Sequence, residues 1–336
     1  MLKRFDGPRG QIHTLRHEST VLRGNRPGDA HVRDVLVYTP PGFDDTRDYP
    51  LLVDLIGYTG SGASHTNWKP FGLNLPERLD MLLAEGKIGP MVVALPDCFT
   101  AYGGNQYIDS TATGPYMTYL CDEIVPFVES RFPIRKNGRG VFGKSSGGYG
   151  AMVHGMMRPD VWNAIASHSG DAYWEWLFLP VMPRLINRLR SVGFDAERLL
   201  AQIHASEKLS SGDVDVMMTL GMAAHYDPDP SAPLGFQLPF DASGRLREDR
   251  WANWLKWDTA RMVDHSGDAI RSLRGWYLDC GDHDQYNIHW GTKLIHESLE
   301  RQGIPHVYEE FNDNHSDVDY RMNVSLPWLW RTLTCK

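Results

Sequence analysis

Cysteine is scarce in this chain, with 4 residues among 336. The four are too few for a disulfide-stapled secreted domain, and none has the spacing of a zinc site. They are Cys98, Cys121, Cys280 and Cys335. We interpret them as buried or idle thiols, and we expect no metal and a reducing, cytoplasmic location. The start at Met1 turns polar at once, so we expect no signal peptide there, and whether a leader was removed stays open.

Long hydrophobic runs are absent, and basic residues are outnumbered. No apolar segment is long enough to cross a bilayer. The 34 lysines and arginines face 42 aspartates and glutamates, a formal net charge of -8. This balance argues against nucleic acid or an anionic membrane as the main partner. We expect a small-molecule partner and leave a homo-oligomer open.

The hydrophobic pattern predicts an α/β fold with a mostly parallel central sheet and helices on both faces. Residues 51–56 and 91–95 are nearly continuous apolar runs, typical of strands covered on both faces, and helical patterns follow them. Residues 171–268 break this alternation and are rich in tryptophan and proline. We interpret the chain as a single domain over residues 1–336, with 171–268 as a cap-like insertion over the carboxyl edge of the sheet. We expect most of its tryptophans to fill core.

The segment from Val141 to Met152 is the strongest motif. It reads as a strand, then G-x-S-x-G centred on Ser145, then a helix opening on small residues. A serine hydroxyl becomes a useful nucleophile when a tight turn exposes it beside a base and oxyanion donors. The flanking glycines permit that turn. Ser145 is therefore the predicted nucleophile.

The same residues also match a phosphate loop, from Gly138 to Ser145. Such a loop needs an apolar strand just before its first glycine. The residues there are polar, the apolar strand lies inside the supposed loop, and Asn137-Gly138 has the composition of a turn. A nucleotide hydrolase is the less favoured alternative.

An acid and a base should follow Ser145 in the order Asp or Glu, then His, at the ends of later strands. Asp282 and Asp284 follow one predicted strand, and His315 follows the next. Either aspartate could hold His315, and His315 would take the proton of Ser145. His283, between the two aspartates, is a weak alternative metal ligand.

Together these segments resemble the putative-esterase family of α/β-hydrolases, which includes S-formylglutathione hydrolase, enterochelin esterases, feruloyl esterases and the antigen 85 mycolyltransferases. The resemblance runs from about His31 to the C-terminus. It is carried by residues 51–57, 105–110, 143–151, 239–241 with Trp251 and Trp254, 281–284 and 314–316.

The resemblance implies an α/β-hydrolase fold and a role for each site residue, without a cofactor. It implies Asp284 as the acid, His315 as the base, and the backbone N–H groups of Tyr58 and Ser146 as the oxyanion hole. Further residues implied at the substrate site are Gly57, Gln106, Tyr107, Lys144 and Trp176. Lys144 and Ser146 stand where many members have His and Met. Lys144 either points away from the pocket or favours anionic substrates from its rim.

We therefore expect a cytoplasmic serine carboxylic-ester hydrolase that forms an acyl-enzyme on Ser145. Thioester hydrolysis or acyl transfer would use the same three residues, so this alternative stays open. A binding protein with this fold but no activity is disfavoured, because all three residues are present.

Overall fold

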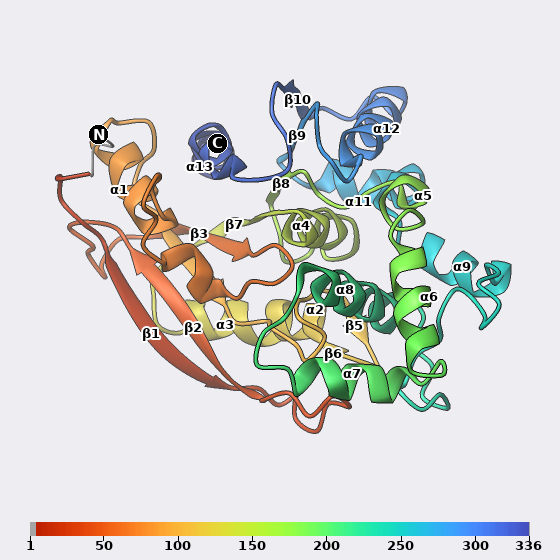
Figure 1. Ribbon diagram of the computed structural model, residues 1–336. Helices are drawn as coiled ribbons and strands as arrows, with labels where there is room; N and C mark the ends of the chain where they lie inside the picture. Colours follow the sequence, from red (N-terminus) through yellow and green to blue (C-terminus); the bar gives the residue numbers. More distant parts are fainter. Residues whose placement is uncertain (1–4, 336) are drawn as a thin grey trace.

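The fold is organised around one eight-stranded sheet (Figure 1). The computed structural model describes residues 5–335, so Met1–Arg4 and Lys336 lie outside it. The prediction that the chain starts without a signal peptide concerns Met1–Arg4 and therefore also lies outside the described residues. The strand order is β1-β2-β4-β3-β7-β8-β9-β10. The strands are β1 (Gln11–Glu18), β2 (Val32–Thr39), β3 (Tyr49–Leu55), β4 (Val92–Pro96), β7 (Ile134–Lys144), β8 (Ala164–His168), β9 (Gly275–Gly281) and β10 (Val307–Phe311). The pairs β1–β2 and β2–β4 are antiparallel and the other pairs are parallel, which confirms the predicted fold class.

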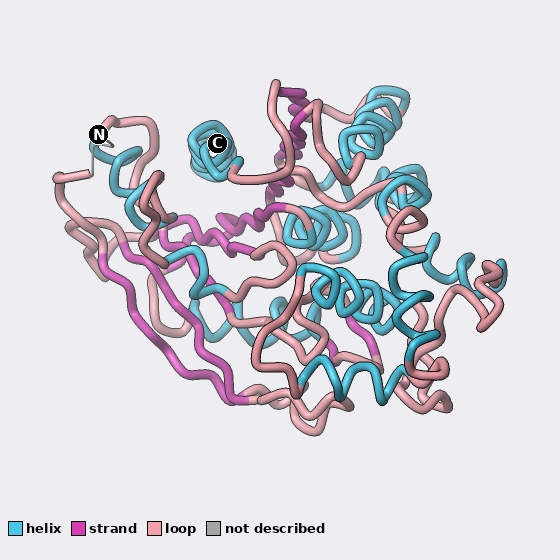
Figure 2. The backbone as a smooth tube through the Cα atoms, in the orientation of Figure 1, coloured by secondary structure: helices cyan, strands magenta, loops and turns pink. Residues whose placement is uncertain are grey.

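Helices cover both faces of this sheet, as Figure 2 shows by colour. Strand β3 is buried along its whole length, because Leu51 and Val53 face one core while Leu52 faces the other. The second core is closed by α1 (Leu75–Ala84) and α13 (Met322–Thr334). The first is closed by α4 (Ser146–Met157), α12 (Ile288–Arg301) and the helices between β8 and β9. The continuous apolar runs of the sequence thus correspond to strands buried on both faces.

Between β8 and β9 the described chain forms helices and no strand of the sheet. They are α5 (Trp174–Leu177), α6 (Met182–Ser191), α7 (Ala196–His204), α8 (Ser211–Tyr226), α9 (Glu248–Leu255), α10 (Thr259–Met262), η3 (Val263–His265) and α11 (Gly267–Ser272). Trp174 and Trp254 are fully buried, which confirms the prediction that such tryptophans fill core. Among residues 5–335, no helix is long and apolar enough to cross a membrane.

The remaining elements are short. They are η1 (Gly62–Thr66), the ribbon of β5 (Asp109–Ser110) and β6 (Gly114–Pro115), α2 (Tyr116–Thr118), η2 (Tyr119–Ile124), α3 (Val125–Glu129) and η4 (Val318–Arg321). A π-helical turn, η2, comes just before Pro126 of α3. Pro126 has no N–H with which to continue an α-helical ladder, so the hydrogen bonding changes at this place.

The turn expected at Asn137-Gly138 is wrong. Both residues lie inside β7, where the register against β3 shifts between the pairs Tyr49–Ile134 and Leu51–Arg139. Asn137 has φ 56°, so its preference for left-handed backbone serves an irregularity within a strand. A strand through residues 138–143 leaves no phosphate loop there, and the nucleotide-hydrolase alternative is therefore wrong.

Candidate active site

Ser145 stands at a strained turn between β7 and α4. Its φ of 57° and ψ of -125° belong to a region that residues with a side chain rarely adopt. Two backbone hydrogen bonds hold this conformation. The Ser145 N–H donates to the His168 carbonyl at 2.9 Å, and the Ser145 carbonyl accepts from the Tyr149 N–H at 2.8 Å. The turn therefore presents the Ser145 side chain at the carboxyl edge of the sheet, as G-x-S-x-G predicts.

The glycines of this motif are required by close packing. A Cβ on Gly147 would lie 1.8 Å from the Leu55 carbonyl oxygen, and one on Gly143 would lie 2.3 Å from the same atom. Both approaches are far inside van der Waals contact. Helix α4 can therefore begin against the end of β3 only because neither position carries a side chain.

His315 and Asp284 meet at the same edge of the sheet. The His315 Nδ1 lies 2.7 Å from Asp284 Oδ2, and both side chains are buried. The other carboxylate oxygen of Asp284 accepts from the Tyr286 N–H at 2.8 Å. Asp282 instead contacts the exposed His283, at 2.6 Å. Of the two aspartates that the sequence left open, the structure brings Asp284 to His315.

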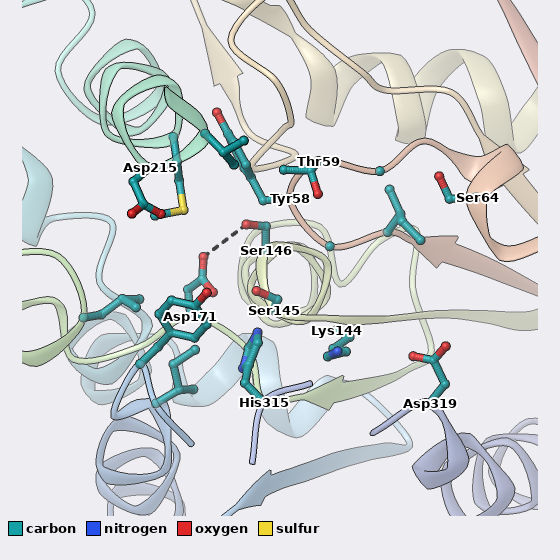
Figure 3. Close-up of a pocket in the computed structure, with 18 of the residues that line it drawn as sticks. Tyr58, Thr59, Ser64, Lys144, Ser145, Ser146, Asp171, Asp215, His315 and Asp319 are labelled. Atoms are coloured by element: carbon teal, nitrogen blue, oxygen red, sulfur yellow. Dashed lines mark hydrogen bonds between the residues drawn. The ribbon is translucent and has the colours of Figure 1, made fainter. Parts of the chain in front are cut away.

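A pocket of about 480 Å³ is lined by Ser145 and His315 together. In Figure 3 the nitrogen side of the His315 ring points toward Ser145. Gly57, Tyr58 and Ser146 line the pocket as well. The Tyr58 and Ser146 backbone N–H groups donate to no other group within residues 5–335, so both are free to bind an anionic oxygen.

The Tyr58 side chain points away from this position. Its hydroxyl donates to the Tyr102 carbonyl, and its ring packs beside Gly104 and Gly221. Burial raises the pKa of Tyr58 well above its usual value. The Tyr58 hydroxyl is therefore engaged by the main chain of Tyr102, whereas its own N–H is not engaged by residues 5–335.

Of the other predicted site residues, some line the pocket and others hold residues that line it. Lys144 lines the pocket, and withdrawal from water lowers the pKa of its ammonium group. Tyr107 is buried outside it and donates its hydroxyl to the Ile56 carbonyl, just ahead of the Gly57–Tyr58 segment. Gln106 is also buried, and its Nε2 donates to Ser146 Oγ at 2.8 Å.

Trp176 lies apart from the pocket of Ser145. It is 52 % exposed and lines a separate surface groove with Tyr173, Trp290 and Leu294. The structure therefore does not bring Trp176 to Ser145, although its neighbours Leu177 and Phe178 do line the pocket of Ser145. The difference arises because successive residues of α5 face different sides of that short helix.

Two acidic groups of this region were missed from the sequence. Asp171 lines the pocket and accepts a hydrogen bond from Ser146 Oγ at 3.3 Å (Figure 3). Asp54 holds His65, another lining residue, by its Nδ1. Burial opposes charge on the His65 imidazole, but the Asp54 carboxylate raises the pKa of His65 above its usual value. Asp171 follows β8 at the carboxyl edge, and that position was a usable signal.

A second Ser-His-Asp set lies inside the protein. Ser325 Oγ is 2.8 Å from His168 Nε2, and His168 Nδ1 is 2.7 Å from Asp279 Oδ1. All three residues are at most 2 % exposed. None of them lines the pocket of Ser145. His168 lies on β8 and Asp279 on β9, so their contact joins two neighbouring strands of the sheet.

Side chains of the kinds that bind metal ions form a cluster elsewhere in the described chain. His296, Glu300 and His306 form the one such group found among residues 5–335, and none of them lines the pocket. His283 is not part of it.

A mostly parallel sheet whose carboxyl edge bears a serine elbow is the architecture of the α/β-hydrolases, and this chain has it. The model of the putative esterase family matches residues 30–325. The chain therefore belongs to that family, and it is an enzyme of the carboxylic-ester hydrolase class.

Solved structures agree with this fold. A ferulic acid esterase is 18 % identical, with a TM-score of 0.61 and coverage of 97 % of this chain and 100 % of that chain. An S-formylglutathione hydrolase from Agrobacterium tumefaciens is 16 % identical, with a TM-score of 0.59 and 99 % coverage of each chain. The fluorophosphonate-binding serine hydrolase F of Staphylococcus aureus is 14 % identical, with a TM-score of 0.59 and coverage of 96 % and 99 %. At these identities the likeness establishes the fold.

Proposed function

We propose that the protein hydrolyses small-molecule carboxylic esters through an acyl-enzyme on Ser145. The observation that carries this proposal is the arrangement of three residues. Ser145 occupies a strained elbow, His315 lines the same pocket, and Asp284 holds the far nitrogen of His315 at 2.7 Å. These positions support Ser145 as the nucleophile, His315 as its base and Asp284 as the orienting acid.

Acylation follows from these positions. Ser145 Oγ attacks the ester carbonyl carbon while its proton passes to His315 Nε2. The carbonyl oxygen becomes negatively charged and accepts hydrogen bonds from the Tyr58 and Ser146 N–H groups. When the intermediate collapses, the C–O bond to the alcohol breaks and His315 gives its proton to the departing oxygen. Asp284 stabilises the imidazolium in between.

Deacylation uses the same residues, with water as the nucleophile and Ser145 Oγ as the leaving group. His315 accepts a proton from water, and the hydroxide oxygen bonds to the acyl carbon. The Ser145 ester bond then breaks, and the proton returns to Ser145 Oγ. The products are a carboxylic acid and the free enzyme. Over the two stages one ester and one water are consumed, and one alcohol and one carboxylic acid are released.

The nucleophile can be tested with a fluorophosphonate probe, which forms a covalent bond with an activated serine. We expect the wild-type protein to be labelled at one residue and Ser145→Ala to be unlabelled, with kcat lowered by about 10⁴. Ser146→Ala is the matched control, because it removes the neighbouring hydroxyl and keeps the backbone N–H, and it should still be labelled. Labelling that persists in Ser145→Ala would overturn the proposal.

A substrate panel tests the reaction class. We expect turnover of a chain-length series of p-nitrophenyl esters, with S-formylglutathione and a feruloyl ester assayed in parallel. If S-formylglutathione is turned over faster than every oxygen ester, the protein is to be assigned as a thioesterase. The Ser145→Ala variant must lose each activity for that activity to be assigned to this pocket.

A further inference from the structure

Three carboxylates line the catalytic pocket, and two of them are paired with a cation. Asp215 forms an ion pair with Arg184, and Asp319 forms one with Lys69. Asp171 has no lysine, arginine or histidine within ion-pair distance among residues 5–335. Asp171 is therefore the acidic group of this pocket whose charge the described protein leaves without a counterion.

The surroundings of Asp171 are poor at stabilising a negative charge. Its side chain is 4 % exposed, and the only hydrogen bonds it accepts from described residues are long and come from neutral groups. Gln106 Nε2 lies 3.4 Å and Ser146 Oγ 3.3 Å from Oδ2. Oδ1 accepts none from the described residues. Burial raises the pKa of Asp171 to about 6, so the carboxylate is mostly ionised at pH 7 and above.

The place of Asp171 in the pocket suits a substrate contact. In the view of Figure 3, Asp171 lies on one side of Ser145 and His315, while Lys144 and Asp319 lie on the other. The pocket also includes the apolar residues Leu177, Phe178, Val214 and Met218. A hydrocarbon arm with one cationic end would match these apolar residues and the bare carboxylate.

We propose that the preferred esters of this enzyme carry an ammonium group and that Asp171 binds it. This inference rests on the proposed function, since it needs Ser145 as the reacting group. The ammonium would donate to Asp171 Oδ1 and supply the counterion that residues 5–335 do not provide. The substrate class is therefore an amine-bearing ester, with the amine on an aliphatic arm of either the acyl or the alcohol part.

Isosteric pairs of esters test this preference for each part of the substrate. The acyl pair is p-nitrophenyl 6-aminohexanoate and p-nitrophenyl heptanoate, and the alcohol pair is 5-aminopentyl benzoate and hexyl benzoate. Within each pair a terminal ammonium replaces a methyl group of similar size. At pH 8 we expect kcat/KM to be at least 10-fold higher for the ammonium member of one pair. A ratio of one or less in both pairs would overturn the inference.

The pH dependence of that ratio separates Asp171 from the catalytic residues. Both members of a pair react through the same Ser145, His315 and Asp284, so effects on these residues cancel in the ratio. The charged and titratable groups that interact with Asp171 are His315, Asp284, Tyr149, Tyr226 and Tyr286. Burial raises the pKa of all three tyrosines, so they stay neutral. We expect the ratio to rise with pH through about 6, as Asp171 ionises. A ratio that does not change between pH 5 and 8 would count against Asp171.

Asp171→Asn supplies the decisive variant. The amide keeps the size of the side chain and an oxygen that can accept from Ser146, but it removes the charge. We expect the ratio to fall to about one and to lose its pH dependence. Asp215→Asn is the matched control, because its charge is already neutralised by Arg184, and its ratio should stay within about 2-fold of wild type.

The outcomes distinguish this inference from the proposed function. Hydrolysis of the neutral esters with no preference for the ammonium members overturns the role of Asp171 alone. Equal losses on both members in Asp171→Asn, with an unchanged ratio, would make Asp171 a positioning residue for Ser146. Failure to hydrolyse any ester, together with absence of labelling at Ser145, would overturn the proposed function itself.

Discussion

Asp284 and Asp282 lie two residues apart in different environments. Asp284 is 2 % exposed and holds His315, whereas Asp282 contacts the exposed His283. Asp284→Asn should lower kcat by about 10⁴, because the amide cannot hold the imidazole tautomer or stabilise its charge. Asp282→Asn should stay within a few-fold of wild type. Steady-state kinetics on p-nitrophenyl acetate compares the two, and the reverse order would contradict the assignment of Asp284.

Tyr58 is expected to act through its main chain. Its hydroxyl donates to the Tyr102 carbonyl, so Tyr58→Phe leaves that carbonyl without this donor and should cost about 1 to 3 kcal/mol of unfolding free energy. Activity should remain within a few-fold, since the N–H that would bind the oxyanion is unchanged. Urea unfolding and kcat, measured on the same variant, separate the two effects. A kcat loss of more than about 100-fold would show that the phenol contacts the reacting ester.

At the scale of elements, two glycines occupy equivalent positions in their helices, and replacing them with alanine should have different effects on the stability of the protein. Gly147 is the second residue of α4 and Gly212 the second residue of α8. An added Cβ at Gly147 meets the Leu55 carbonyl at 1.8 Å, while at Gly212 it meets only Ser210 Oγ, at 3.7 Å.

Gly147→Ala should therefore destabilise the protein by about 3 kcal/mol or more, because α4 must move away from β3. Fluorophosphonate labelling of Ser145 should fall with it. Gly212→Ala should be neutral or stabilising by up to about 1 kcal/mol, from helix propensity. Thermal unfolding of both variants checks this, and equal melting temperatures would contradict the packing argument.

Elements that depend on local chemistry could be predicted from the sequence. Asn74 is a residue type that favours the start of a helix, and it caps α1, where its side chain accepts from the Glu77 N–H three residues on. The continuous apolar run of β3 also predicted its burial. The composition of Asn137-Gly138 predicts a turn, but the sequence does not show that β3 and β8 would pair with β7 on either side and that Asn137 would lie within that strand.

The site was predictable where motif and chain order sufficed, which covered Ser145 and the loops of Asp284 and His315. The choice between Asp282 and Asp284 depends on which side chain the loop turns inward. The absence of a described cation beside Asp171 depends on which residues pack around it. These residues, such as Gln106, come from segments that are distant in the sequence. Trp176 and Phe178 are two residues apart, and only the packing of α5 decides which one meets the pocket.

At the scale of the whole molecule, the burial of Asp171 should have a cost in stability that varies with pH. Its pKa is raised from 3.8 in the unfolded chain to about 6 in the fold. The folded protein therefore retains a proton that the unfolded chain loses, and Asp171 lowers stability as the pH rises from about 4 to 6. A shift of this size corresponds to about 3 kcal/mol at pH 8.

Asp171→Asn should consequently raise the melting temperature at pH 8 and have a much smaller effect at pH 4. The difference between variant and wild type isolates this group, because other ionisations contribute to both proteins. Differential scanning calorimetry at the two pH values measures it. A variant that is less stable than wild type at pH 8 would show that the hydrogen bonds of Asp171 outweigh its charge.

The inner set of Ser325, His168 and Asp279 has a consequence for how enzymes are recognised. A search that matched only the mutual distances of a serine, a histidine and an aspartate would also find this protein at that set, none of whose residues lines the pocket of Ser145. Ser145 differs because it lines a pocket. The N–H groups of Tyr58 and Ser146, which line the same pocket, donate to no other group within residues 5–335. What makes a hydroxyl chemically useful here is the empty space that a second molecule can enter, and three correctly spaced side chains do not create it.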